Sequence, residues 1–102
     1  MDTVTLADTG RLLYGDEWQR ALAKALGPLH PDGARDSIDD RLVRRWAAGD
    51  RPVPIWVDEA LLKLLDKRAF AFMHRVNLIR ERAAQIRSSL APVADDGPEM
   101  RF

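Results

Sequence analysis

The sequence contains no cysteine, a single tyrosine and only two histidines. The lack of cysteine excludes disulfides and thiolate metal sites, and it fits a reducing cytosol, so we expect a cytoplasmic protein. No apolar run approaches the roughly 20 residues that a membrane-spanning helix needs. The acidic start, residues 1–10, has no apolar stretch and does not resemble a signal peptide. The length of 102 residues fits one small domain.

Patterns typical of catalysis and metal binding are also missing. Neither His30 nor His74 has a second histidine three or four residues away, so we expect no metal site. The aspartates at 39–40 and 95–96 are adjacent pairs that diverge on a helix, which does not suit an acid–base dyad. There is no phosphate-binding glycine loop and no recognisable Ser-His-acid set. We therefore expect neither an enzyme nor a cofactor.

The net charge is zero, with 16 basic and 16 acidic residues, which argues against a simple polybasic nucleic-acid binder. The basic residues are nevertheless concentrated. Residues 35–51 hold five basic and four acidic residues, and residues 67–90 hold six and one. Local potential matters more to a polyanion than the total charge. The basic 67–90 segment is either the solvated flank of a coiled coil or a DNA-backbone contact through Lys67, Arg68 and Arg75.

What the sequence has in abundance is Ala, Leu and Arg, without the alternation of a strand, so an all-α fold is expected. The first helix is expected over about Thr5–Tyr14, with Leu6, Leu12 and Leu13 as its core contacts and Gly15 as its end.

Asp16 is a suitable N-cap for a second helix. In that helix Trp18, Leu22 and Leu26 repeat at intervals of four, which predicts one buried stripe. Gly27, followed by proline, is expected to end it.

Residues 28–36 are expected to form a loop, with Ser37 as the N-cap of a third helix over about Ile38–Ala48. Ile38, Leu42 and Trp46 again repeat at intervals of four. All three tryptophans, Trp18, Trp46 and Trp56, are expected in the core. The opposite face of the third helix presents polar residues: Asp40, Arg41, Arg44 and Arg45. Gly49 is expected as its C′ residue, before a turn with two prolines.

Residues 58–90 lack proline and glycine, which predicts one long helix or two helices that meet near Lys67. Beyond this point apolar residues step by three and four over three heptads, the spacing of a coiled-coil seam. The alternative is an intramolecular core helix. We expect homodimerisation through the larger part of this seam: Phe72, Val76, Ile79, Ala83, Ile86 and Leu90. The tail, residues 91–102, is expected to be disordered.

The run LYGDEWQRALAKALG, followed by RLVRRWAAGDRPVP and a leucine-rich helix, resembles the Cro/repressor-type (Xre-like) helix-turn-helix family of small phage and proteobacterial regulators. The resemblance covers about residues 12–66. Gln19, Ala23 and Gly27 match the family's spaced glutamine, small residue and turn glycine, and Val43 and Trp46 match apolar positions of its recognition helix. It implies a lambda-repressor-like domain at 1–66, followed by a C-terminal helix at 67–90.

The matched positions have a physical reason. A small Ala23 lets the third helix cross the second closely, and Gly27 is expected to leave the second helix in a left-handed conformation. Val43 and Trp46 would hold the third helix so that its other face meets base edges in the major groove.

The resemblance therefore implies double-stranded DNA as the partner. Arginine reads guanine with two hydrogen bonds or grips a phosphate. The third helix and its start supply the expected base contacts: Ser37, Asp39, Asp40, Arg41, Arg44 and Arg45. Gln19, Arg20 and Arg51 are expected phosphate contacts.

The chain departs from the family in the turn. Gly27 and Val43 are 16 positions apart, against six in the family, so the turn holds ten additional residues. This insert is expected to loop out and to add backbone contacts through His30 and Arg35.

The expected function is sequence-specific DNA binding by a homodimeric transcriptional regulator. The alternative is a protein–protein module, of the kind found in antitoxins or phage accessory proteins, whose C-terminal helix binds a partner.

Overall fold

The computed structural model describes the backbone of residues 1–94 and the side chains of residues 1–90. Within that range the chain is all-helical and forms no strand, which confirms the all-α prediction. It divides into two units, Met1–Arg68 and a second that starts at Ala69. No helix in the described part has an apolar stretch sufficient to cross a bilayer.

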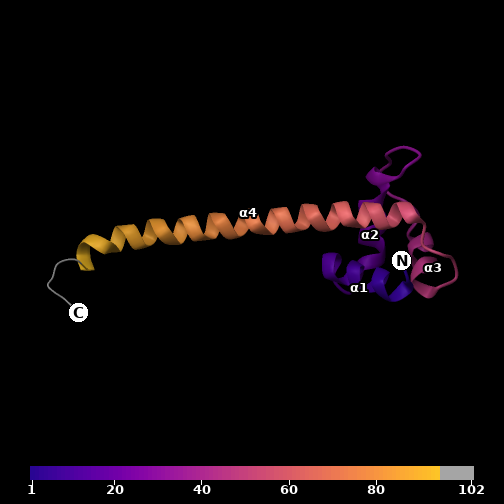
Figure 1. The fold of residues 1–102 in the computed structure, drawn as a ribbon, viewed down its shortest axis with the longest axis horizontal. Helices are drawn as coiled ribbons and strands as arrows, with labels where there is room; N and C mark the ends of the chain where they lie inside the picture. Colours follow the sequence, from indigo (N-terminus) through magenta and orange to yellow (C-terminus); the bar gives the residue numbers. More distant parts are fainter. Residues whose placement is uncertain (95–102) are drawn as a thin grey trace. The chain divides into compact units, whose positions relative to one another are not determined.

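The first unit contains α1 (Thr3–Tyr14), α2 (Trp18–Leu26), the short 3-10 helix η1 (Gly27–Leu29), α3 (Asp40–Ala48) and the start of α4 (Ile55–Ala94) (Figure 1). α2 packs against both α1 and α3, and α1 also contacts α3. The structure thus has a single long α4, and it continues four residues beyond the end predicted at residue 90. The rest of the predicted tail, residues 95–102, lies outside the described residues.

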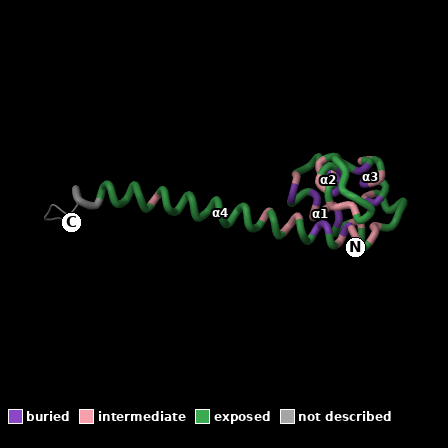
Figure 2. The backbone as a smooth tube through the Cα atoms, turned by 90° about the horizontal axis from the view of Figure 1, so that it is seen from above, coloured by how far each residue is buried: buried purple, intermediate pink, exposed green. Residues whose placement is uncertain are grey.

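One apolar core holds the first unit together (Figure 2). Full burial of one leucine or valine side chain stabilises a fold by about 1.5–3 kcal/mol relative to leaving it exposed to water. α4 completes the core with Val57, Ala60 and Leu61. Leu12, expected to be buried, is 77% exposed, because α1 turns its neighbours Leu6 and Leu13 inward instead.

Polar contacts link α4 to α1 and to Met1 within this unit. The Arg68 guanidinium donates a 2.7 Å hydrogen bond to the Leu13 carbonyl and lies 5.5 Å from the centre of the Tyr14 ring. At the other end, the N-terminal ammonium of Met1 lies 3.3 Å from the Asp58 carboxylate. Arg68, one of the suggested DNA-backbone contacts, therefore has an internal role as a link between the two helices.

Two predicted N-caps are wrong. The residue at the N-cap of α2 is Glu17, not Asp16, and no side chain caps this helix. The N-cap of α3 is Asp39, not Ser37, because the Asp39 carboxylate accepts a hydrogen bond from the backbone N–H of Arg41. α3 accordingly begins at Asp40, two residues later than predicted.

Gly27 is required for a different reason from the one expected. Its φ of −50° is right-handed, so it does not leave α2 through a left-handed conformation. A Cβ at this position would instead lie 2.5 Å from Ser37 Cα and 2.6 Å from the Arg35 carbonyl oxygen. The segment that joins α2 to α3, residues 28–39, which we call the insert, thus passes directly over the end of α2, which only glycine allows. By contrast, Gly49 ends α3 with φ +82°, as predicted.

Candidate nucleic-acid interface

α3 has one buried and one exposed side. Val43 and Trp46 are buried in the core, and Leu42 is half-buried. Ile38, just before the helix, is also buried. These apolar contacts fix which face of α3 is buried in the core and which face is exposed to solvent. The guanidinium groups of the remaining face are exposed as predicted: Arg41, Arg44 and Arg45.

The inserted segment is fastened to α2 by main-chain hydrogen bonds. The Arg35 N–H donates to the Gly27 carbonyl (3.1 Å), and the Ile38 N–H donates to the Ala23 carbonyl (3.0 Å). Each carbonyl also accepts a second hydrogen bond close by, Ala23 from the Gly27 N–H and Gly27 from the His30 N–H, so the segment uses the second lone pair of each oxygen. The insert is therefore part of the α2–α3 packing and brings the start of α3 close to α2. Ala23 is buried at this contact, in agreement with the need for a small residue there.

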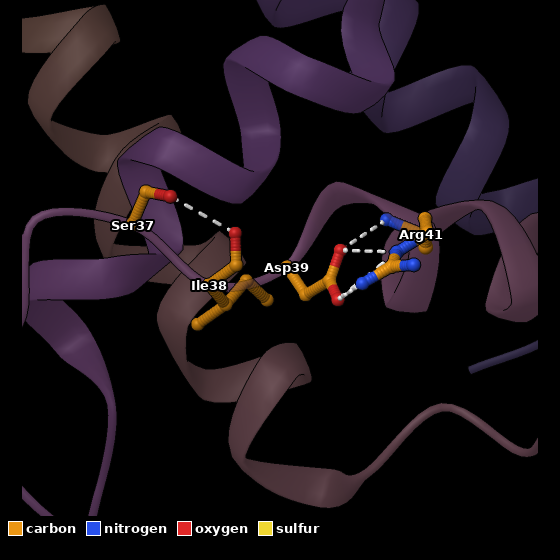
Figure 3. A network of polar contacts seen from close by, with 4 residues as sticks. All are labelled: Ser37, Ile38, Asp39 and Arg41. Atoms are coloured by element: carbon orange, nitrogen blue, oxygen red, sulfur yellow. Dashed lines mark hydrogen bonds and ion pairs between the residues drawn. The ribbon is translucent and has the colours of Figure 1, made fainter.

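A compact polar network forms the start of α3 (Figure 3). Asp39 Oδ1 accepts from the backbone N–H of Arg41, and the Arg41 guanidinium donates to both carboxylate oxygens at 3.0–3.2 Å. These hydrogen bonds lower the pKa of Asp39 below its usual value and raise that of Arg41. Ser37, expected as a DNA contact, donates its hydroxyl to the Ile38 carbonyl at 2.9 Å.

The second arginine of α3 also has an acidic partner. Arg44 lies 3.4 Å from Asp40, one helical turn earlier. Such exposed pairs contribute little stability, about 0.2–1 kcal/mol, so an incoming phosphate can compete for the arginine. Arg45 has no ion pair within residues 1–90. The three guanidinium groups thus differ in how readily they engage a new anion.

Three surface hollows meet at Asp39. The largest, of about 490 Å³, lies between the insert, α3 and the α3–α4 turn. It brings together the predicted phosphate contact Arg51 and the insert residues Arg35 and His30. The His30 and Trp56 rings, 4.9 Å apart, form part of its wall. Trp56 is half-buried there, so its placement in the core was only partly right.

A second hollow, of about 450 Å³, lies between α2 and the start of α3. Arg20 and Lys24 line it from α2, opposite Asp36, Asp39 and Asp40. Lys24 was not among the predicted contacts, although its spacing of four from Arg20 places both on one helix face. Gln19, the neighbouring predicted contact, is half-buried. The third hollow is bounded by Asp39, Leu42 and two of the α3 arginines, Arg41 and Arg45.

No protein-family model, no curated protein and no solved structure matches the chain. Within residues 1–94 no group of three His, Asp or Glu side chains is placed to hold a metal ion.

The residues predicted for dimerisation lie on α4, in the second unit. The large ones are 40–62% exposed: Phe72, Val76, Ile79, Ile86 and Leu90. Ala83, at the middle of the same stripe, is half-buried.

Proposed function

We propose that this protein binds double-stranded DNA as a helix-turn-helix regulator, with the exposed face of α3 in the major groove. The observation that carries the proposal is the division of α3 into a side buried by Val43 and Trp46 and a side that offers three arginines. A helix of this width fits the major groove, and arginine is the residue that most often reads guanine there.

The surroundings of α3 support the same orientation. Arg20 and Lys24 on α2, and Arg35 and Arg51 on the two loops that flank α3, line hollows next to its first turn. Basic side chains at the edge of a recognition helix are typical phosphate contacts, which fix the position of the helix on the duplex. Four cationic side chains thus surround the exposed face of α3, which itself carries three arginines.

The carboxylates of Asp39 and Asp40 lie in this cationic surface and lower its attraction for phosphate. Both are engaged by arginines of the same helix, and a carboxylate can also accept from the amino group of cytosine. We expect modest non-specific affinity and a larger share of base readout, consistent with the zero net charge.

The test is binding of the full chain to labelled duplexes, followed by fluorescence anisotropy. The duplexes are the region upstream of the gene and sequences selected from a random pool. Arg44→Ala and Arg45→Ala are each expected to weaken specific binding by about 5- to 150-fold, since a bidentate base contact is worth about 1–3 kcal/mol. The matched control is Arg11→Ala, an exposed arginine of α1 that is paired with Asp8. Equal affinity of all three variants and wild type would refute the proposal.

A further inference from the structure

The second unit carries an apolar stripe without a partner in the described chain. It is the seam, which we define as the seven residues spaced by three and four along α4: Ala69, Phe72, Val76, Ile79, Ala83, Ile86 and Leu90. Its large side chains are 40–62% exposed. An exposed apolar stripe of this kind marks a contact surface. The residues that flank the stripe determine which partner can cover it.

The positions that flank the seam are cationic. With Val76 at position a and Ile79 at position d of a heptad, the adjacent e and g positions hold six residues: Met73, Arg80, Arg87, Arg75, Arg82 and Ser89. Four of them are arginines and none is acidic. Glu81, the one acidic residue of 67–90, falls at position f, away from the seam. The e and g positions set partner choice in coiled coils, because they face each other across the interface.

These flanks oppose pairing with a second copy. In a parallel homodimer each g residue faces an e residue of the partner's next heptad, so Arg75 meets Arg80 and Arg82 meets Arg87. In an antiparallel pair e faces e and g faces g, and arginine again meets arginine. The seam is also short, and two of its seven residues are alanines that bury little area. The free energy gained by burying the seam in a homodimer is therefore small, and the repulsion between the arginines opposes association.

We propose that the seam docks a helix of another protein that has apolar residues at its a and d positions and Asp or Glu at its e and g positions. Each arginine then faces a carboxylate, and the same apolar stripe is buried. This replaces the homodimer that the spacing alone predicts, and it does not depend on DNA binding by α3.

Two other anionic partners suit the seam less well. A bilayer surface requires a wide apolar sector. Exposed Met73 at e and Leu78 at c extend the seam on one side, but arginines occupy the other two e positions and two of the three g positions and narrow the sector. Duplex DNA would engage the arginines and leave the apolar residues between them in water. An acidic amphipathic helix would pair with the arginines and would also bury the apolar residues of the seam.

The test uses full-length wild type and a variant with all four arginines reversed, Arg75→Glu, Arg80→Glu, Arg82→Glu and Arg87→Glu. Analytical ultracentrifugation measures the association of each protein alone and of an equimolar mixture in which one of the two proteins carries a fluorescent label. We expect both proteins alone to be monomeric and the mixture to form a 1:1 complex. The dissociation constant should be at least about tenfold below that of self-association, and the complex should weaken at about 1 M salt. Ile79→Asp in the wild-type partner should abolish it.

A second variant tests the repulsion directly. Arg75→Glu with Arg82→Glu places glutamates at g opposite arginines at e, so this protein is expected to form a homodimer. If the fully reversed variant loses helicity, the full-length variant with Arg75→Glu and Arg82→Glu carries the test by itself, with wild type as control. A wild-type homodimer as tight as the mixed complex, no mixed complex, or tighter binding of this segment to phosphatidylserine vesicles or DNA would overturn the proposal.

Discussion

The Asp39 carboxylate caps α3 and at the same time holds the guanidinium of Arg41, two residues later. A single side chain thus starts the proposed recognition helix and neutralises its first arginine. These two tasks are separable by substitution, because asparagine caps a helix about as well as aspartate but has no charge.

Asp39→Asn is expected to keep the helix and to tighten DNA binding by about two- to fivefold, since Arg41 is freed and a charge that repels phosphate is removed. Asp39→Ala removes the cap as well and should lower the thermal stability. Anisotropy with duplex DNA and thermal unfolding by circular dichroism measure the two effects. Weaker binding by the asparagine variant at unchanged stability contradicts this role.

The acid sensitivity of the fold should depend on its two aspartate caps. Hydrogen bonds from Thr5 lower the pKa of Asp2, and hydrogen bonds from Arg41 lower that of Asp39. A lowered folded-state pKa gives stability that is present above the unfolded value, near 3.9, and is lost as the pH falls through the folded value. Combining Asp2→Asn with Asp39→Asn should flatten the drop in Tm below about pH 4. Parallel Tm curves for variant and wild type would show that other groups are responsible.

Gly27→Ala is expected to destabilise the protein by about 1–3 kcal/mol, because the added Cβ meets the backbone of Ser37 and Arg35 and cannot be relieved by a side-chain rotation. Urea unfolding gives the free energy. Ala34→Ser, an exposed change in the same insert, serves as the control and should stay within about 0.5 kcal/mol of wild type. An unchanged free energy of unfolding for Gly27→Ala would mean that the insert is not packed over α2.

Arg68→Met should cost about 1–3 kcal/mol of unfolding free energy, because it leaves the Leu13 carbonyl without its donor while the apolar stem is kept. Lys67→Met, at the exposed neighbouring position, is the matched control. If the two variants unfold at the same urea concentration, the link between α1 and α4 contributes nothing measurable.

Much of the first unit could be predicted from apolar spacing. The stripe of Trp18, Leu22 and Leu26 and the buried positions of α3 are found where a period near four places them. The exposed arginines follow as the remaining face of the same helix. These features depend on the order of residues along one helix, which the sequence contains directly.

The helix starts and the role of Gly27 could not be predicted in the same way. Ser37 and Asp39 are both good caps, and the choice between them depends on the path of the insert. That path is set by hydrogen bonds to Ala23 and Gly27, which are distant in the sequence from the residues that donate them. A glycine needed for close approach looks the same in a sequence as one needed for a left-handed turn.

The central claim is that the exposed face of α3, and not the basic segment of α4, meets DNA. The most direct measurement is the change in arginine side-chain and backbone amide NMR signals as a specific duplex is added. The largest changes are expected at Arg41, Arg44 and Arg45, with smaller ones at Arg20, Lys24 and Arg51. Changes confined to residues 67–90, with the α3 signals unmoved at saturation, would contradict it.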